Sequence, residues 1–184
     1  MRTFPFEGPM NNKLAFSLFC ALLAATGAAR ADYKVTMNSV DAKGVGAAVG
    51  SVRVAVAPGG GVVFTPDLKG LAPGTHGFHV HDAGNCGAKE KDGKMSPAEM
   101  AGSHYDPAKS GKHAGPEGSG HKGDLPALEV AADGTATKPV AAKHLVLKEL
   151  AGRSLMVHEG GDNYADQPKP LGGGGTRIAC GVIK

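Results

Sequence analysis

Short segments of alternating apolar and polar residues, separated by turns, are the feature that most constrains the fold of this chain. Residues 33–37 and 52–56 alternate, and a PGGG turn at 58–61 precedes an apolar segment at 62–64. Glycine (29 residues) and proline (12) are frequent and Trp is absent, which favours many turns over long helices. Further strands are expected at 75–81, 128–130, 135–137, 144–147, 154–158 and 178–183, with a hairpin turn at Asp133-Gly134. About eight short strands predict an all-β antiparallel sandwich or barrel, although residues 140–150 could instead hold a short helical turn.

Two long segments interrupt this pattern. Residues 83–125 run for more than forty positions with almost no apolar periodicity and many Gly, Lys, Asp, Ser and His residues, and residues 160–176 are similar. Unpatterned segments of this length are uncommon inside a compact domain and are usually functional or disordered. Both border histidines, so we expect two long functional loops that a metal orders.

The first 31 residues have the layout of a secretory signal peptide. Residues 14–29 are mostly apolar and uncharged, Lys13 precedes them, and Ala29-Arg30-Ala31 supplies a small-residue cleavage site. We therefore expect cleavage after Ala31, an exported protein and one domain at 32–184. Glu7 and Pro9 are unusual in a basic leader, which suggests Met10 as the true start. An uncleaved membrane anchor is the alternative, but the apolar run is short for a transmembrane helix.

Net charge and cysteine content narrow the classes of protein to which this chain could belong. Removing residues 1–31 takes away Arg2, Lys13, Arg30 and Glu7, which leaves 17 basic and 16 acidic residues and a formal net charge of +1. This balance, without a basic stripe, gives no indication of nucleic-acid binding. Two cysteines remain, Cys86 and Cys180, and an even pair in an exported protein predicts one disulfide. Two buried free thiols are the alternative.

A pair of histidines lies on the predicted strand at 75–81. Successive strand side chains point to opposite faces, so His79 and His81 share one face while Phe78 and Val80 share the other. Two imidazoles on one face can bind a metal ion, and the two apolar side chains behind them can enter a core. The sequence thus predicts half of a metal site at this strand.

Further ligand-type residues gather in the first long loop. His104, His113, His121 and Asp124 offer three imidazoles and one carboxylate, which can close a tetrahedral zinc site of the structural kind. His79, His81 and His158, at the end of another predicted strand, suit copper or zinc. A single histidine is more often a surface or hydrogen-bonded residue, and we assign His144 to that class. His76 would face away from His79 and His81, so we expect it to support the site by hydrogen bonding.

Five motifs occur in the order found in copper/zinc superoxide dismutases. They are GFHVH at 77–81, AGSHYDP at 101–107, the span from His113 to HKGDL at 121–125, MVH at 156–158 and GTRIACGV at 175–182. The similarity covers essentially all of residues 32–184, and GGDN at 160–163 with the segment 168–175 resembles the bacterial periplasmic branch. The resemblance implies an eight-stranded antiparallel Greek-key sandwich, or flattened barrel, in a periplasmic enzyme.

The resemblance also implies roles for individual residues. It implies one copper ion and one zinc ion per subunit, with copper on His79, His81, His104 and His158 and zinc on His104, His113, His121 and Asp124. His104 would then bind both metals. The family places an aspartate behind the site, hydrogen-bonded to one histidine of each metal. Asp162 is the first choice and Asp166 the second. Cys86 and Cys180 match the family disulfide, which would fasten the loop with the zinc ligands to the last strand.

The implied reaction converts superoxide to dioxygen and hydrogen peroxide while copper alternates between Cu(II) and Cu(I). His104 would carry a proton, and Arg177 would bind the small anion through its charged guanidinium fork. The segment 160–176 lacks the dense charges with which eukaryotic relatives guide superoxide. Lys89, Glu90 and Lys91 are candidates for steering, and a merely solvated charged loop is the alternative.

Two other classes of metal-binding protein fit part of this set of residues. A periplasmic copper carrier would need the histidines but neither Arg177 nor a closed zinc site. A zinc hydrolase would need a general base and a substrate cleft beyond the carboxylates already assigned. We expect superoxide as the partner, with no nucleic acid and no stable membrane association after signal removal. The sequence leaves monomer and homodimer equally open.

Overall fold

A computed structural model describes residues 1–3 and 32–184 of the chain. The expected cleavage site after Ala31 and the alternative start at Met10 therefore lie outside the described residues or at their boundary. Within the described part, helices are short 3₁₀ turns, and no helix is long and apolar enough to cross a membrane.

The main element is an antiparallel sheet of seven strands. Its order is β5-β10-β11-β1-β2-β3-β9, so β1 lies between β2, its neighbour in sequence, and the C-terminal strand β11. Such a return of a distant strand to the first is typical of Greek-key connections. The strands of this sheet are β1 (Asp32–Asp41), β2 (Gly44–Val56), β3 (Val62–Leu68), β5 (Phe78–His81), β9 (Val140–Ala142), β10 (Ser154–His158) and β11 (Arg177–Val182).

Two short two-stranded sheets and three 3₁₀ helices complete the described elements. The pairs are β4 (Gly74–His76) with β8 (Leu128–Val130), and β6 (Lys89–Lys91) with β7 (Lys94–Ser96). The helices are η1 (Glu99–Ala101), η2 (Leu147–Glu149) and η3 (Pro170–Gly173). All the strand pairs run antiparallel, which confirms the all-β antiparallel expectation.

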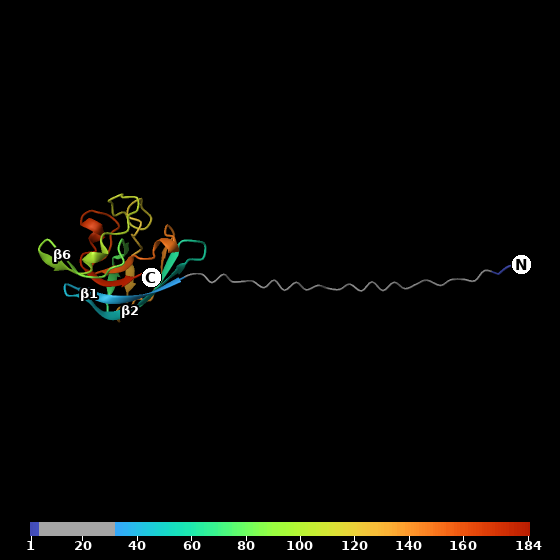
Figure 1. Cartoon of the computed structure of the whole chain (residues 1–184), viewed down its shortest axis with the longest axis horizontal. Coiled ribbons are helices and arrows are strands. Elements are labelled where there is room, and N and C mark those ends of the chain that lie inside the picture. Colours follow the sequence, from blue (N-terminus) through green and yellow to red (C-terminus); the bar gives the residue numbers. More distant parts are fainter. Residues whose placement is uncertain (4–31) are drawn as a thin grey trace.

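The sheet curls around one main hydrophobic core. Val35, Val54 and Phe64 from the first three strands are buried in the same cluster as Phe78 of β5 and Leu155 of β10. The Phe64 and Phe78 rings meet edge to face with their centroids 5.8 Å apart, a favourable aromatic geometry. In Figure 1, β1 and β2 lie on one side of the molecule and the long loops on the other. This arrangement leaves the outer face of β5 for the loops to cover.

The strand expected at 75–81 is two strands in different sheets. The break falls at Gly77, where the chain meets β10 and the segment after it: Gly77 donates to Gly160 O at 2.7 Å and accepts from His158 N at 2.8 Å. A Cβ at this position would lie 3.2 Å from the His79 ring and 3.3 Å from His158 Cβ, so a side chain here would crowd the histidines. The expectation of one continuous strand was wrong because tertiary pairing overrides local alternation.

Other boundaries also differ from those expected. Residues 135–137 form no strand and contribute an isolated bridge between Ala136 and Leu68. Residues 144–147 are likewise not a strand, since β9 precedes them and η2 follows from Leu147, as the helical alternative for 140–150 anticipated. The loop at 83–125 contains the unexpected β6–β7 hairpin and η1. Eleven strands are thus described where about eight were expected.

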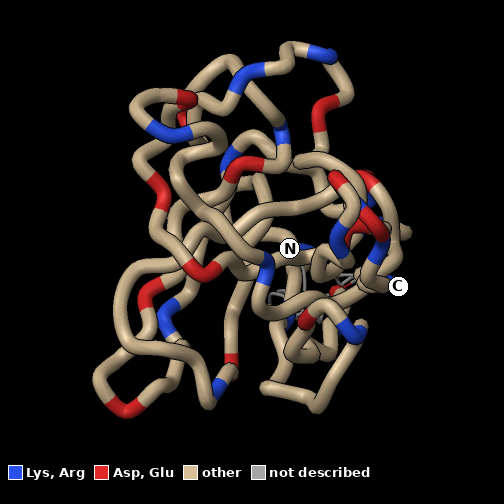
Figure 2. The backbone as a smooth tube through the Cα atoms, turned by 90° about the vertical axis from the view of Figure 1, so that its left-hand side faces the viewer, with Lys and Arg blue, Asp and Glu red and all other residues tan. Residues whose placement is uncertain are grey.

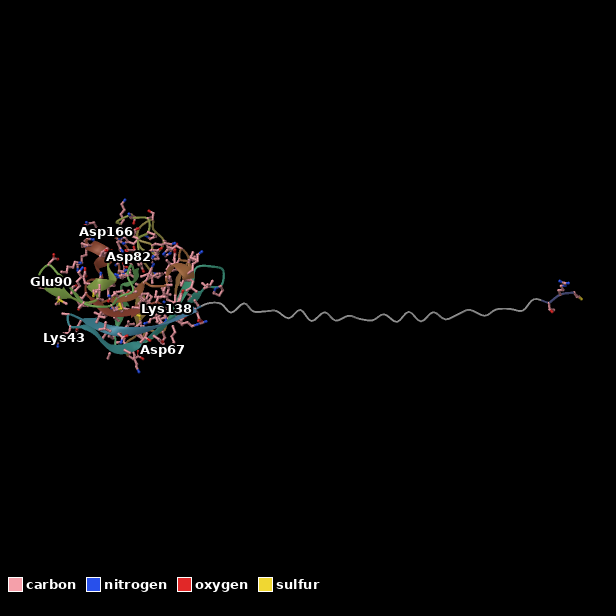
Figure 3. The ribbon with its side chains drawn as sticks, viewed as in Figure 1. Lys43, Asp67, Asp82, Glu90, Lys138 and Asp166 are labelled. Atoms are coloured by element: carbon pink, nitrogen blue, oxygen red, sulfur yellow. A yellow bond between two sulfur atoms is a disulfide. The ribbon has the colours of Figure 1, made fainter. Side chains whose placement is uncertain are left out.

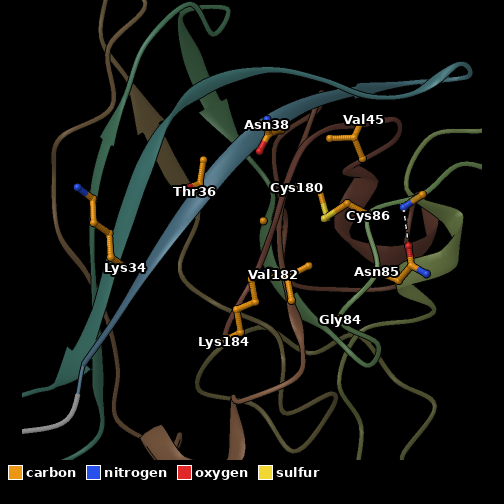
Figure 4. Close-up of a pocket in the computed structure, with 12 residues that line it drawn as sticks. Lys34, Thr36, Asn38, Val45, Gly84, Asn85, Cys86, Cys180, Val182 and Lys184 are labelled. Carbon is orange, nitrogen blue, oxygen red and sulfur yellow. Dashed lines mark hydrogen bonds between the residues drawn. A yellow bond between two sulfur atoms is a disulfide. The ribbon is translucent and has the colours of Figure 1, made fainter.

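The predicted disulfide joins Cys86 to Cys180 across 94 residues, with their Cα atoms 5.7 Å apart. Figure 4 shows it beside β1, at a surface pocket of about 580 Å³. The turn before it is tightened by a hydrogen bond from Gly87 N to Asn85 Oδ1 at 2.9 Å, drawn dashed in the same view. The bridge therefore fastens the start of the first long loop to β11.

Candidate metal centre

Four histidines from three parts of the chain converge on the outer face of β5. Strand geometry places His79 and His81 there, both fully buried, and β10 brings His158 alongside. His104 comes from the first long loop, where it forms an isolated bridge with His81. One ring nitrogen of each of the four lies within 4.8 Å of one in every other. The histidines expected to bind copper are thus brought together.

The inward nitrogens of this cluster lack protein partners. His79 Nδ1, His81 Nε2, His104 Nε2 and His158 Nε2 are all buried with no hydrogen-bond partner. Leaving a buried polar atom unpaired costs about 1–3 kcal/mol each, so four in one place need an explanation. Neutral imidazole nitrogens are ligands for copper and zinc, and a metal ion at their meeting point would satisfy all four.

The outward nitrogens fix how each ring is presented. His81 Nδ1 lies 2.9 Å from Gly102 O, and His158 Nδ1 lies 3.1 Å from Gly175 O. Because a carbonyl oxygen can only accept, each of these nitrogens carries the proton and the inward one is left free. His79 follows the same rule through a carboxylate, since its Nε2 lies 2.8 Å from Asp162 Oδ2. Such outer partners set the tautomer of ligand histidines.

A second cluster surrounds the buried carboxylate of Asp124. His104 Nδ1 lies 2.8 Å from Asp124 Oδ1, His113 Nδ1 3.0 Å from Oδ2, and His121 Nδ1 3.6 Å from Oδ1. One ligand atom from each of His79, His104, His113 and Asp124 lies within 4.8 Å of one in every other, a group that does not include His121. His121 Nδ1 is nevertheless buried without a hydrogen-bond partner, whereas the nitrogens of His79 face Asp162 and the first cluster. Three imidazoles and a carboxylate fit a closed zinc site.

Asp162 connects the two clusters. Its Oδ2 accepts from His79 Nε2 and its Oδ1 from His113 Nε2, both at 2.8 Å. The structure thus places Asp162, rather than Asp166, behind both sites. Asp166 instead accepts from the backbone N–H of His113 at 3.0 Å. Gly172, at φ 69°, packs so closely on Asp162 that a Cβ there would overlap its Oδ1.

Burial and neighbouring charges separate the protonation states of the cluster. Burial lowers the pKa of His79 and of His81 well below the usual value, and it lowers the pKa of His158 to about 4. Burial also acts to lower the pKa of His113, but the Asp124 and Asp162 carboxylates outweigh it and raise the pKa to about 9. The first cluster therefore presents neutral imidazoles at neutral pH, the form that binds a metal.

Arg177 lies at the mouth of the site. Its Nη1 donates to Ala98 O and its Nη2 to Gly102 O, both at 2.7 Å, and Glu99 Oε2 lies 3.5 Å from Nη1. Gly102 O also accepts a hydrogen bond from His81 Nδ1, so one carbonyl orients both the arginine and a histidine of the first cluster. A pocket of about 520 Å³ opens here, and its lining includes Lys91, His104, His158 and Arg177. Burial lowers the pKa of Arg177.

The other residues singled out in the sequence lie outside the two histidine clusters. His76 is buried with its ring nitrogens 2.7 Å from His158 O and 2.8 Å from Ala72 O, a hydrogen-bonding position of the kind expected. His144 Nε2 lies 3.0 Å from Lys122 O, outside both clusters. Lys91 lines the pocket and pairs with Glu99 at 3.0 Å. Lys89 and Glu90 are exposed on the same hairpin, with Glu90 at its outer edge in Figure 3.

Glu99 was not among the residues identified from the sequence. It lies between Lys91 and Arg177 and carries the negative charge nearest to the guanidinium among the described ion pairs. A lone glutamate in an irregular loop has no spacing that marks it, so its role depends on the turn at η1. That turn brings the carbonyls of Ala98 and Gly102 to Arg177 as well.

Comparisons with known proteins agree with this geometry. The family model described as copper/zinc superoxide dismutase (SODC) matches residues 48–183. Superoxide dismutase [Cu-Zn] of Escherichia coli (strain K12) is 58% identical over 171 residues, covering 92% of this chain and 98% of that protein. The corresponding protein of Brucella abortus biovar 1 is 51% identical over 172 residues, covering 91% of this chain and 99% of that protein.

Solved structures show the same fold. The Cu/Zn superoxide dismutase from Brucella abortus superimposes with a TM-score of 0.82 at 52% identity, covering 84% of this chain and all of that one. The monomeric copper, zinc superoxide dismutase from Salmonella enterica gives a TM-score of 0.75 at 57% identity, with the same coverage. Both the expected fold and the resemblance drawn from the motifs are confirmed. The chain belongs to the copper/zinc superoxide dismutase family.

Proposed function

We propose that the copper- and zinc-loaded protein disproportionates superoxide, taking two superoxide anions and two protons to dioxygen and hydrogen peroxide. The observation that carries this proposal is the set of four buried, unpartnered imidazole nitrogens that face one point, with Arg177 at the mouth of the same pocket. Family membership supports the same reaction. A copper ion bound there would supply the one-electron redox chemistry, through its Cu(II) and Cu(I) states.

The two clusters would hold one copper ion and one zinc ion per chain. His79 Nδ1, His81 Nε2, His104 Nε2 and His158 Nε2 would bind copper. His104 Nδ1, His113 Nδ1, His121 Nδ1 and Asp124 would bind zinc. Zinc has no redox chemistry of its own, so its part would be to hold His104 in place and tune the copper site.

His104 would serve both sites because its two ring nitrogens face different clusters. Nδ1 lies at Asp124, and Nε2 faces the other three histidines without a partner. With a cation in each cluster, loss of both ring protons would be favoured, and the two nitrogens of His104 could then serve as one ligand to each site. The role of His104 Nε2 would be to take up a proton and give it to the peroxide product, whose second proton would come from water.

Arg177 would bind superoxide by charge and by hydrogen bonding. Its two bonds to Ala98 O and Gly102 O hold the guanidinium rigid beside His104 and His158, so little reorganisation is needed when the anion arrives. Lys91, at the rim of the same pocket, would help attract the anion, and Glu99 would offset part of that field. Lys89 and Glu90 lie further out on the hairpin, where their effect would be weaker.

The leader and the disulfide support an exported protein. We propose that residues 1–31 are removed after Ala31 and that 32–184 form the single mature domain. A disulfide persists in the oxidising bacterial periplasm, and the family resemblance points to that compartment. Defence against superoxide there, as a monomer or a homodimer, would be the biological role.

Metal analysis joined to a dismutation assay on residues 32–184 tests this proposal. We expect one copper and one zinc per chain and rapid superoxide decay, which His79→Ala and His158→Ala abolish because each removes a copper ligand. His144→Ala, a histidine outside both clusters, is the matched control and keeps full activity. Full metal loading without dismutation would contradict the enzyme proposal and favour a copper carrier. Zinc loading with ester or amide hydrolysis would favour a hydrolase.

A further inference from the structure

Tyr164 joins the two long loops at the side of the second cluster. Its hydroxyl oxygen accepts a hydrogen bond from the backbone N–H of Ala127 at 3.0 Å, just beyond the last zinc-ligand candidate. Its ring lies directly on Gly115, where an added Cβ would be 2.5–2.9 Å from the tyrosine side chain. Residues from 160–176 and from 83–127 thus meet at one aromatic side chain.

The backbone of the same residue holds Asp162. Tyr164 N donates to Asp162 Oδ1 at 2.7 Å, and this oxygen also accepts from His113 Nε2 at 2.8 Å. Tyr164 adopts a left-handed φ of 60°, a conformation that costs energy for a bulky residue unless its surroundings compensate. The close contact of its side chain with Gly115 helps to hold this conformation.

Burial in the core does not explain this tyrosine. It is 40% exposed, and it lines a pocket of about 250 Å³ together with Ala127 and Asp162, whose side chain is buried. Its contacts are therefore specific ones to the zinc-side loop rather than general packing. Asp166 makes a second contact of the same kind through the backbone N–H of His113.

We propose that Tyr164 is a positioning residue for the zinc site, holding Asp162 against His113 by tying the two loops together. The inference rests on the assignment of zinc to His104, His113, His121 and Asp124 made above. It concerns how long zinc is retained, not whether superoxide reacts.

Two variants separate the parts of this contact. Tyr164→Phe removes only the hydroxyl bond to Ala127, whereas Tyr164→Asn also removes the ring while tolerating the left-handed backbone better than alanine. Tyr33→Phe, at a half-buried tyrosine of β1 far along the chain, is the matched control. The zinc-loaded full domain is mixed with excess chromophoric chelator, and the rate of zinc release is followed.

Tyr164→Phe should release zinc about two- to tenfold faster than wild type, the range expected for one net hydrogen bond, and Tyr164→Asn faster still. Tyr33→Phe should match wild type. With Co(II) in the zinc site, the visible spectrum should change in Tyr164→Asn and not in Tyr33→Phe. The melting temperature of the metal-free protein should change little in Tyr164→Phe, since the hydroxyl acts on the metal site.

Wild-type release rates in both Tyr164 variants would overturn the proposal. So would a loss of metal-free stability in Tyr164→Phe that accounts for all of the faster release. Dismutation by wild type is measured separately, because its absence would contradict the proposed function while leaving the zinc-release comparison intact.

Discussion

At the scale of single residues, Arg177 combines charge with a fixed orientation. Replacing it by alanine should lower the second-order rate of superoxide decay on the order of 100-fold, the cost of losing a preorganised charge at a reacting anion. Arg177→Lys should fall between the two, because lysine keeps the charge but cannot make both bonds to Ala98 O and Gly102 O. Stopped-flow decay of superoxide on metal-loaded protein measures this.

Arg53→Ala is the control for removing a positive charge, since Arg53 is exposed and paired with Asp32 on the sheet. If it slowed the reaction as much as Arg177→Ala, the effect would come from net charge and not from the pocket.

Glu99 opposes anion binding at the same place. Its carboxylate lies 3.0 Å from Lys91 Nζ and 3.5 Å from Arg177 Nη1, so Glu99→Gln would unmask both cations. We expect a small competing anion such as azide to bind about three- to tenfold more tightly to this variant at low salt. Optical titration of the copper-loaded protein gives the dissociation constant.

Glu90→Gln removes an identical charge from the exposed part of the hairpin and should shift azide binding much less. Equal shifts in the two variants would show that the long-range field, and not the contact with Arg177, sets the affinity.

Residue types and spacing were enough to predict that the histidines and Asp124 gather, because ligand-type residues recur in short motifs such as those at 77–81 and 121–125. Groups that act through the backbone could not be identified in this way. The carbonyl oxygen of Gly102 orients both His81 and Arg177, but every residue type has a backbone carbonyl, so the identity of residue 102 does not predict this role. The contacts of Tyr164 and Glu99 depend on how the two long loops fold against each other and against β11, so they follow from tertiary structure.

At the scale of elements, the disulfide ties the first long loop to β11. It closes a span of 94 residues, and the chain-entropy account gives about 4–5 kcal/mol of stabilisation as an upper figure. The Cys86→Ser/Cys180→Ser protein should therefore lose about 2–5 kcal/mol of unfolding free energy when metal-free. Guanidinium unfolding followed by circular dichroism measures the difference.

The metal-loaded double variant should lose less stability, because metal ions bound by the two clusters would also hold this loop to β5 and β10. An unchanged unfolding free energy in the metal-free state would contradict the assigned role of the bridge.

Strands were predicted correctly where an apolar segment is also buried in the structure. They were predicted wrongly where hydrogen bonds to distant strands determine where a strand begins and ends. The strand at 154–158 was predicted with its observed bounds, since all five residues are buried in a strand that pairs with β5 on one side and β11 on the other. Residues 75–81 also read as one strand, but the backbone of Gly77 hydrogen-bonds to His158 of β10 and to Gly160, and this divides the segment into β4 and β5. The β6–β7 hairpin consists almost wholly of polar residues, so it has no apolar periodicity from which its strands could be predicted.

At the scale of the whole molecule, charge of both signs is spread over the surface. Figure 2 shows Lys and Arg interspersed with Asp and Glu along the backbone, in keeping with the net charge of +1 for residues 32–184. Attraction of an anion would therefore depend on the local field at the pocket rather than on overall charge.

The pH dependence of stability also belongs to the whole molecule, because several buried groups titrate together. In the metal-free protein, burial lowers the pKa of His79, His81 and His104, and that of His158 to about 4, from an unfolded value near 6.5. The unfolded chain then takes up protons first on acidification, so stability falls as the pH decreases from about 6.5 towards 4. His113, with its pKa raised to about 9, acts in the opposite sense: its contribution is complete below 6.5 and is lost as the pH rises through 9.

Metal-free stability should therefore be greatest near pH 6.5–7 and decline on both sides, more steeply on the acid side because four histidines act together. Melting temperatures at pH 9, 7, 5.5 and 4.5 measure this, and His158→Gln should flatten the acid slope by removing one of the four groups. Bound metal should delay the acid loss, since protons must displace it from neutral imidazoles before the clusters can charge. A metal-free melting temperature that stays constant from pH 7 to 4.5 would show that these histidines are not held neutral by burial, and the unpartnered nitrogens would then need a different explanation.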